Sequence, residues 1–547
     1  MSLYRQMTAP SVTPPSAPAA APGNSPVPAP SVRRPVESRD PATGEVWRRW
    51  DSADEAAVAM AVARARAAQP AWAATSPAER ARVIERFRAA LFRRSDEIAA
   101  LITRESGKPL VDALGADVTV ALDFAAWIAK QAPRFLQGDW RGVAGMTMWR
   151  KRVRVSRTPL GVIGIIAPWN YPFFLPTSCA LPALACGNAA IIKPSEYTPA
   201  SAAVIEELFR EAGLPDGLLQ VLQGDGVTGA ALTRSGVDKM MFTGGEAAGR
   251  KVAIACAEQL IPCSLELGGS DAAIVLADAD VRYAADGIAW TRFSNAGQTC
   301  VAPKRIFVEA PAYDAFVEAM SRAVRALQVG PGTDASSEVG PLIRPQAKAT
   351  IAAQCEDAVS RGATIAAQAP APEGDCFFPP TLLTNVDDTM RVLREETFGP
   401  LLPVVKVRDA DEAIARANRS EFGLSASVWT GDRARGLAVA KRLQAGTVLI
   451  NDAIAVVGMA DVPYGGVKSS GIGRMHGLAG LEDCVQSTPI VDDRFTAWRQ
   501  AWWFGYGPQH LEGVRAFQRL AHGRSLGERL SGLMGTIRLV LARKRGS

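Results

Sequence analysis

The chain has 547 residues, which is too long for one ordinary hydrophobic core, so its length predicts two or more domains. A hydrophobic fraction of 48% and a charged fraction of 21% are typical of a globular protein and exclude a disordered or fibrous one. The net charge of +6 is concentrated in residues 494–547, which contain ten Lys and Arg residues but only two acidic residues, Glu512 and Glu528. The remainder is about neutral, so no nucleic-acid-binding core is indicated.

The cysteines and histidines give no sign of a metal site. The chain has eight cysteines and three histidines, without a CxxC pair or a cluster at zinc-ligand spacing. A disulfide scaffold would be unusual in so long a chain, so the cysteines favour a reduced, cytoplasmic setting. We therefore predict that the protein binds no metal.

The first 36 residues are rich in proline, alanine and serine and contain no apolar segment like that of a secretory signal. Such a segment buries too little surface to fold, so residues 1–36 are predicted to be a disordered leader. Ordered structure is predicted from the turn-rich segment 37–47. Ala/Arg-rich helices are predicted over 56–93, with a helix start at Ser76.

From residue 149 onwards the pattern changes to strands that alternate with helices. The segment WRKRVRVS (149–156) predicts an exposed strand. Short β-rich runs separated by helical segments then occur at 161–168, 188–194, 218–222, 239–244 and 272–276. A second block of this kind extends from about residue 305 to residue 450. The alternation predicts parallel sheets covered by helices, in two tandem α/β domains.

Polar residues and glycines follow three of these predicted strands, at the position where ligands bind in open α/β sheets. They are Trp169-Asn170, the KPSE segment 193–196 and Gly244-Gly245. Lys193 and Glu196 could bind the ribose of a nucleotide, and the glycines could let a pyrophosphate approach a helix N-terminus. No GxGxxG follows the first strand, however, and each charge could equally be a solvated loop residue.

Two further residues carry candidate chemistry. Glu266 lies between two leucines in LELGG (265–269), where burial would raise its pKa, and it is either a satisfied structural carboxylate or a general base. Cys300 ends NAGQTC (295–300) and is a small buried hydrophobe, a metal ligand or a nucleophile. Because no histidine precedes His476, a Cys–His pair in the core is not expected, and a carboxylate would serve as the base. Thiols are acidic enough to need little help from it.

Together, the motifs resemble those of the aldehyde dehydrogenase superfamily over roughly residues 40–490. They are, in order, ESGKPL (105–110), PWN, NAAIIKPSE, FTGG, LELGG, NAGQTC, EETFGP (395–400) and PYGGVKSSGIGR (463–474). The resemblance implies that Cys300 is the nucleophile, Glu266 the general base and Asn170 the oxyanion-hole side chain. It also implies a cofactor site that contains Trp169, Lys193, Ser195, Glu196, Gly244, Gly245, Glu396 and Phe398. In that site Lys193 and Glu196 would hold the adenosine ribose. Glu396 would hold the nicotinamide ribose, with Phe398 beside the nicotinamide.

The resemblance also implies a domain organisation. Two doubly wound α/β domains would be present, with a cofactor-binding domain at 37–142 and 160–267 and a catalytic domain at 268–475. A small β oligomerisation arm would comprise 143–159 and 476–493, and residues 494–547 would form a basic amphipathic tail. Because relatives pair this arm across a subunit interface, a homodimer or homotetramer is expected.

The implied reaction is oxidation of an aldehyde to a carboxylic acid through a cysteine thiohemiacetal and thioester. NAD is favoured over NADP, although NADP is possible, because the Glu196 carboxylate would accept from a free 2′-hydroxyl and repel a 2′-phosphate. The main alternative is a CoA-acylating aldehyde dehydrogenase, in which a base at the Glu266 position is often absent. Another alternative is a catalytically idle membrane or assembly module. One departure is FTGGEAAGR (242–250), which places Glu246 beside the expected pyrophosphate.

The substrate is only weakly indicated. Trp169, Tyr171, Phe174 and Tyr464 would make the substrate tunnel aromatic or would simply pack in the core, and the entrance segment 452–461 is not diagnostic.

In the tail, one apolar helical face is predicted from Leu526, Leu530, Leu533, Met534, Ile537 and Leu541. No apolar run approaches the ~20 residues needed to span a bilayer. The face would dock on the enzyme or a neighbouring subunit. Alternatively, it would lie on an anionic membrane, with Trp498, Trp502, Trp503, Phe504 and Tyr506 at headgroup depth. The membrane reading favours long-chain or hydrophobic aldehydes.

Overall fold

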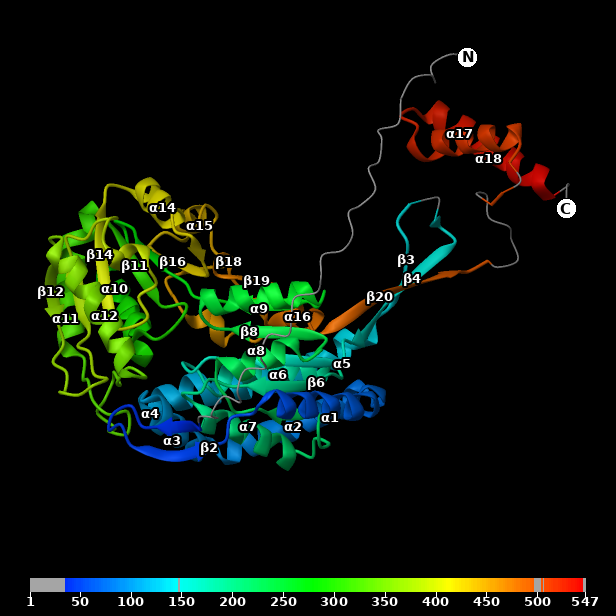
Figure 1. Cartoon of the computed structure of the whole chain (residues 1–547). Coiled ribbons are helices and arrows are strands. Elements are labelled where there is room, and N and C mark those ends of the chain that lie inside the picture. The colour runs from blue at the N-terminus through cyan, green and yellow to red at the C-terminus, as the bar shows by residue number, and fades with distance from the viewer. Residues whose placement is uncertain (1–34, 146–147, 496–502, 505, 545–547) are drawn as a thin grey trace, which may run out of the picture. The chain divides into compact units, whose positions relative to one another are not determined.

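The computed structural model describes residues 35–145, 148–495, 503–504 and 506–544. Most of the predicted leader, residues 1–34, lies outside the described residues. Ordered structure begins slightly earlier than predicted, because Val36 already belongs to strand β1. Two α/β sheets and a small antiparallel sheet carry the architecture (Figure 1), which confirms the predicted fold class.

The N-terminal part is a short hairpin followed by helices. Strands β1 (Val36–Arg39) and β2 (Val46–Trp50) pair antiparallel. The elements that follow are α1 (Glu55–Ala74), α2 (Pro77–Arg93), α3 (Ser95–Ser106), α4 (Leu110–Asp112), the π-helical η1 (Ala113–Thr119) and α5 (Val120–Gln137). The predicted start at Ser76 is confirmed by a capping box. The Ser76 Oγ accepts from the Glu79 N–H, and the Glu79 carboxylate accepts from the Ser76 N–H at 2.7 Å.

The first α/β sheet has six strands in the order β19-β9-β8-β5-β6-β7. Its members are β5 (Val162–Ile166), β6 (Ala189–Lys193), β7 (Leu219–Val221), β8 (Lys239–Thr243), β9 (Cys263–Glu266) and β19 (Gly471–Ile472). The helices between them are α6 (Phe174–Ala185), α7 (Pro199–Glu211), α8 (Gly226–Arg234) and α9 (Glu246–Glu258). The chain runs outward from β5 in one direction and returns to β8 on the other side of β5. The topological switch point therefore lies between β5 and β8.

The second α/β sheet has seven strands in the order β12-β13-β14-β11-β10-β16-β17. They are β10 (Asp271–Val275), β11 (Pro303–Glu309), β12 (Thr364–Gln368), β13 (Thr381–Thr384), β14 (Leu401–Val407), β16 (Ser425–Trp429) and β17 (Thr447–Ile450). Helical elements are α10 (Val281–Phe293), η3 (Ser294–Gly297), α11 (Ala310–Ala326), α12 (Pro345–Ser360), α13 (Arg391–Arg394), α14 (Ala410–Asn418), α15 (Arg433–Ala440) and η4 (Ala455–Gly458). All pairs in this sheet are parallel except β12 with β13.

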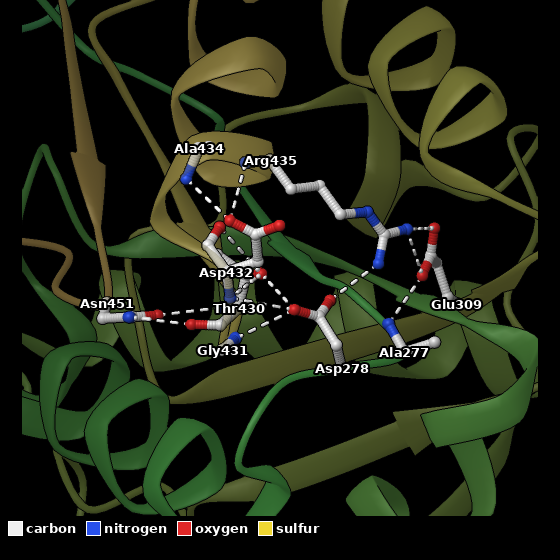
Figure 2. A network of polar contacts seen from close by, with 9 residues as sticks. All are labelled: Ala277, Asp278, Glu309, Thr430, Gly431, Asp432, Ala434, Arg435 and Asn451. Carbon is white, nitrogen blue, oxygen red and sulfur yellow. Dashed lines mark hydrogen bonds and ion pairs between the residues drawn. The ribbon is translucent and has the colours of Figure 1, made fainter.

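A polar network closes the carboxyl end of the seven-stranded sheet at its own switch point, between β10 and β16 (Figure 2). Asp278 accepts from the Thr430 hydroxyl at 2.6 Å and the Gly431 N–H at 3.1 Å, and it pairs with Arg435 at 2.7 Å. Arg435 also binds Glu309 at 2.8 Å. These contacts tie α15 to β10 and β11. Because the protein's own side chains fill this switch point, the one between β5 and β8 is the better place for a nucleotide.

The remaining sheets are small. The arm sheet has the order β20-β4-β3, with β3 (Trp140–Gly142), β4 (Lys151–Pro159) and β20 (Val485–Asp493), and helix α16 (Gly477–Glu482) precedes β20. Strands β15 (Phe422–Gly423) and β18 (Val467–Lys468) form a two-stranded ladder.

Two observations differ from the predicted domain boundaries. Residues 140–142 pair with the arm instead of joining the cofactor-binding domain, and β19, predicted in the catalytic domain, adds an antiparallel edge strand to β9.

The tail forms two helices, α17 (Pro508–His522) and α18 (Leu526–Lys544), which pack against each other. The predicted helix start at Leu526 is confirmed. Trp498 and Trp502 lie outside the described residues. Among the helices of the described segments, none is both long enough and apolar enough to cross a bilayer.

Candidate active site

A tight left-handed turn presents Cys300. After α10 the backbone φ is +51° at Asn295, +54° at Ala296 and +71° at Gly297. For Ala296 this conformation costs about 1–2 kcal/mol, and such strain concentrates at functional sites. A Cβ on Gly297 would lie 2.6 Å from the Gly399 carbonyl oxygen, so only glycine lets the NAGQTC segment approach the EETFGP segment this closely.

The Cys300 thiol lies in an apolar, half-buried position beside Tyr464. Its Sγ is 3.6 Å from the Tyr464 hydroxyl. Burial raises the pKa of the thiol to about 11, although Lys304 and Tyr464 act in the opposite direction. The resting thiol is therefore less acidic than a free one. This finding corrects the expectation that the thiol needs little help, because a base must take its proton at neutral pH.

Glu266, at the end of β9, fits the role of that base. It is only 5% exposed, and its Oε2 is buried without a hydrogen-bond partner in the described part of the chain. Burial raises the pKa of the carboxyl well above its usual range, with Arg474 opposing the shift. A Cβ on Gly465 would lie 2.9 Å from the Glu266 Oε1, so the carboxyl lies beside the Tyr464–Gly465 segment, and the Tyr464 hydroxyl contacts the Cys300 thiol. A carboxyl group with a raised pKa and an open oxygen is poised for proton transfer.

Asn170 follows β5, where backbone and side-chain bonds hold it in place. Its Nδ2 donates to the Gln298 carbonyl at 3.0 Å. Its own carbonyl accepts from the Lys108 Nζ at 2.7 Å and from the Asn295 Nδ2 at 2.9 Å. The amide therefore points toward the Cys300 segment, and its second N–H can stabilise an oxyanion there.

Lys108 is a functional residue that sequence reasoning missed. It lies in the ESGKPL motif, which contributes to the family resemblance but to which no catalytic or binding role is assigned from the sequence. Its side chain is fully buried, forms an ion pair with Asp117 at 2.6 Å and lies 4.1 Å from the Tyr171 ring centroid. Asp117 belongs to η1, a π-helical segment of the kind that is frequent at functional sites. Asp117 also accepts from the Phe174 N–H at 3.0 Å, so the pair fixes the whole loop around Asn170.

Lys304 is a second residue that sequence reasoning missed. Its fully buried Nζ donates to the carbonyls of Thr299 at 3.0 Å and Cys300 at 2.5 Å, and it lies 3.6 Å from a Glu396 carboxylate oxygen. Glu396 also accepts from the Gly269 N–H at 2.9 Å. A single lysine thus joins the cysteine segment to Glu396. Lys304 directly precedes the second strand–helix block, which was predicted from about residue 305, and no motif marked it.

The switch point of the six-stranded sheet carries the predicted cofactor residues. After β6, the Lys193 Nζ lies 3.8 Å from the Glu196 carboxylate, and the Ser195 Oγ accepts from the Tyr197 N–H at 3.2 Å. The Trp169 and Phe398 rings meet edge to face at 5.6 Å. Trp169 follows β5 and Phe398 precedes β14, so this contact joins segments of the two α/β sheets.

The glycines at the start of α9 leave room for an anion. Gly245 is the N-cap of α9 and makes no side-chain cap, and nothing lies within 4 Å of a Cβ built there. The N–H groups at the helix N-terminus can therefore bind a pyrophosphate. Glu246 does not oppose this, because its carboxylate binds Arg250 at 2.6 Å, one helical turn along. The residues present thus fit a dinucleotide.

An apolar wall borders Cys300 on its other side. Val301, Leu424, Val456 and Tyr464 form a buried cluster with Leu449, Ile454, Val457 and Val462 packed around it.

The His476 ring stacks on Tyr464 at 5.2 Å and meets Phe124 edge-on at 4.6 Å. Burial lowers the pKa of His476 to about 3, so it is neutral. Sequence reasoning set this histidine aside as downstream of the core. The structure stacks it on Tyr464, and the Tyr464 hydroxyl contacts the Cys300 thiol.

The fold and the residues around Cys300 are typical of an α/β enzyme that binds a dinucleotide, and the comparisons specify the class further. The model of the aldehyde dehydrogenase family matches residues 27–490. Glutarate-semialdehyde dehydrogenase of Pseudomonas putida is 39% identical over 453 residues, which cover 82% of this chain and 93% of that protein. The 4,4'-diapolycopene aldehyde oxidase of Methylomonas sp is 35% identical over 488 residues, which cover 89% of this chain and 91% of that protein.

Solved structures agree with this assignment. An NADP-dependent enzyme of E. coli superposes with a TM-score of 0.80 at 36% identity, covering 84% of this chain and 95% of that one. PnpE in complex with nicotinamide adenine dinucleotide gives a TM-score of 0.80 at 33% identity, covering 84% and 94%. The chain belongs to the aldehyde dehydrogenase family. Its reaction is accordingly the NAD(P)-dependent oxidation of an aldehyde.

Proposed function

We propose that Cys300, Glu266 and Asn170 carry out this oxidation. Glu266 takes the thiol proton, and the Cys300 thiolate adds to the aldehyde carbon to give a thiohemiacetal oxyanion. The Asn170 amide and the Cys300 backbone N–H stabilise that charge, by roughly 3–4 kcal/mol per donor in a well-formed site. NAD(P)+ supplies the hydride acceptor when bound. Loss of hydride leaves a thioester on Cys300, and Glu266 then deprotonates the water that hydrolyses it to the acid.

The observation that carries this proposal is the buried Glu266 oxygen that has no partner in the described part of the chain, in a carboxyl beside the Tyr464–Gly465 segment, where Tyr464 also contacts Cys300. A hydrolytic enzyme needs such a base, whereas transfer of the acyl group to CoA does not. The test is NAD(P)H formation over an aldehyde panel, with and without CoA, and product analysis. We expect free acid and no requirement for CoA. Formation of an acyl-CoA, or a rate that depends on CoA, would favour the acylating alternative.

We propose that Lys193 and Glu196 hold the adenosine ribose and Glu396 the nicotinamide ribose, with NAD preferred over NADP. Support comes from the position of Glu196, whose carboxylate lies beside Lys193 and would repel a 2′-phosphate. The variant Glu196→Gln keeps the shape of the side chain but removes its charge. Its ratio of kcat/KM for NADP to that for NAD should rise at least tenfold. An unchanged ratio would show that Glu196 does not select the cofactor.

The substrate is proposed to be a long-chain or hydrophobic aldehyde. Side chains that pack beside Cys300 include Val301, Leu424, Val456 and Tyr464, and such an apolar cluster favours an apolar aldehyde. The Methylomonas relative acts, by its name, on 4,4'-diapolycopene aldehyde. We expect kcat/KM to rise with alkyl chain length and to be lowest for succinate and glutarate semialdehydes. The reverse order would refute the apolar assignment.

The setting proposed for the enzyme is cytoplasmic, as a homodimer or homotetramer that pairs through the β3-β4-β20 arm. Residues 494–547 are proposed to make peripheral contact with an anionic membrane, which would bring the enzyme to apolar aldehydes. The match with the Methylomonas relative spans 488 residues and covers 89% of this chain. Residues 37–493 are fewer than that, so the match extends into the leader or the tail. Light scattering of the purified protein measures the oligomeric state.

A further inference from the structure

The two tail helices pack through small residues. A Cβ on Gly532 would lie 2.2 Å from the Leu520 nitrogen and 2.5 Å from the Ala516 carbonyl oxygen. A Cβ on Gly535 would lie 2.5 Å from the Ala516 Cβ, and Ala516 itself is 2% exposed. Glycines on α18 thus let α17 approach closely. The α17–α18 hairpin is therefore a packed unit, and Gly532 and Gly535 lie on the face of α18 that contacts α17.

Five large apolar side chains in the described part of α18 point outward. Leu526, Leu530, Leu533, Met534 and Ile537 are between 41% and 76% exposed. With about 100° of rotation per residue, these positions form one stripe, and Gly532 and Gly535 fall on roughly the opposite side of the helix. We call these five residues the α18 stripe. Because the hairpin core is made by the other face, the stripe needs a different apolar partner.

Positive charge borders the stripe. Arg529 and Arg538 lie about 90° to either side of its centre on the helical wheel. Arg515, Arg519 and Arg524 add charge on α17 and in the turn, and residues 494–547 contain only two acidic residues, Glu512 and Glu528. Glu528 is engaged in capping α18, because it accepts from the N–H groups of Arg524 at 2.7 Å and Ser525 at 3.1 Å. An apolar helical stripe with flanking arginines is complementary to an anionic lipid surface.

We propose that α18 lies in the interface of an anionic membrane, with the α18 stripe in the acyl boundary and Arg529 and Arg538 at headgroup level. Helix α17 supports α18 from behind through the Gly532 and Gly535 contacts. This inference rests on the proposed peripheral membrane contact and specifies the surface that makes it. The charge of the remaining chain is close to neutral, so electrostatics favours the lipid over the enzyme's own surface.

The test is co-sedimentation of the full-length protein with phosphatidylserine-containing and phosphatidylcholine vesicles. The variant Leu530→Gln/Ile537→Gln removes apolar surface from the stripe without adding a charge that would itself repel anionic lipid. The matched control, Leu511→Gln/Val514→Gln, removes exposed apolar surface from α17, where the two residues are 57% and 54% exposed. We expect wild type to bind only the anionic vesicles, the stripe variant to bind at least tenfold more weakly, and the control to stay within twofold of wild type.

Folding and catalysis are followed separately, by circular dichroism and by oxidation of a short, water-soluble aldehyde. Wild type that stays in the supernatant with anionic vesicles overturns the membrane contact. A stripe variant that binds like wild type overturns only the role of the stripe. If the stripe variant lowers the oligomeric mass and wild type does not bind vesicles, the stripe is a subunit interface and the proposal is wrong. Absence of activity with every aldehyde would count against the catalytic proposal alone.

Discussion

At the residue scale, burial sets the chemistry of the cleft. It raises the pKa of both the Cys300 thiol and the Glu266 carboxyl. The thiol therefore loses its proton less readily, and the carboxylate binds a proton more tightly. Lys304 and Tyr464 lower the pKa of the thiol in partial compensation. The proposed nucleophile therefore depends on residues that hold and polarise it, and each dependence can be tested by a single substitution.

Replacement of the nucleophile is the most direct test. Cys300→Ala should abolish aldehyde-dependent NADH production, because it removes the sulfur that forms the thiohemiacetal, while the fold remains intact. Initial rates together with circular dichroism measure both effects. Aldehyde-dependent NADH production by purified Cys300→Ala protein at more than a trace of the wild-type rate would remove Cys300 from the role.

Glu266→Gln should stall the enzyme after hydride transfer. The amide cannot take a proton from water, so rapid mixing should give a burst of NADH followed by turnover at least 100-fold slower than wild type. Steady-state turnover equal to wild type would exclude Glu266 as the base.

The same variant has a predicted stability signature. The folded-state pKa of Glu266 is raised, so its contribution to the free energy of unfolding is complete below the ordinary carboxyl pKa of 4.5 and is lost as the pH rises through the raised value. Glutamine does not ionise. The Tm of Glu266→Gln relative to wild type should therefore increase with pH, as measured by calorimetry between acidic and neutral pH. A constant difference would mean that Glu266 does not titrate abnormally.

Lys304→Met should act on both partners of the lysine. Without the cation the pKa of the Cys300 thiol rises, so the pH profile of its alkylation by iodoacetamide should shift upward, in the absence of cofactor. Glu396 loses an ion pair, so the KM for NAD should also rise severalfold. Lys406→Met, at a half-exposed lysine of β14, is the matched control and should change neither quantity. An alkylation profile identical to wild type would contradict the electrostatic role.

At the scale of elements, the π-helical η1 and the loop after β5 act together through the buried Lys108–Asp117 pair. Both side chains are 0% exposed, so the removal of one partner strands the other charge in the interior. Lys108 donates to the Asn170 carbonyl, and Asp117, in η1, accepts from the Phe174 N–H at the start of α6. Nothing in the local periodicity of residues 113–119 indicated this geometry.

Lys108→Met should destabilise the protein by about 3–5 kcal/mol, because Asp117 is left buried and unpaired. The double variant Lys108→Met/Asp117→Asn should recover most of that loss while kcat stays low, since the Asn170 carbonyl has still lost its bond to Lys108. Urea unfolding and steady-state kinetics measure the two effects. If the double variant recovers both stability and kcat, the pair does not position Asn170.

At the scale of the whole molecule, the proposed catalytic residues come from segments far apart in the chain. Glu266 ends β9, Cys300 precedes β11, Glu396 follows α13 and Tyr464 follows η4, and all of them precede the arm strand β20. A chain that ends after Asp493 should therefore keep its Tm within a few degrees and its kcat on a short, water-soluble aldehyde within twofold. Activity lost on truncation, with the fold preserved, would show that the tail belongs to the catalytic unit.

The sequence by itself predicted the alternation of strands and helices and the family, and it supplied the site residues that we propose. The β-rich runs at 161–168, 188–194 and 239–244 became β5, β6 and β8, because short apolar segments with β-branched residues between helices have few alternatives to buried parallel strands. The motifs identified the family because their residues are chemically specific. Local patterns report the period and polarity of one segment at a time.

Only the tertiary structure decided which distant groups meet. The reach of Lys304 to Glu396, the stacking of His476 on Tyr464 and the pairing of β19 with β9 each join segments separated by many residues, and no local pattern encodes such contacts. The same holds for the high pKa of Cys300, because desolvation depends on every segment packed around the thiol. In the tail, the sequence predicted an apolar stripe. Its outward orientation was decided by the glycine contacts between α17 and α18, since helices pack closest where side chains are smallest.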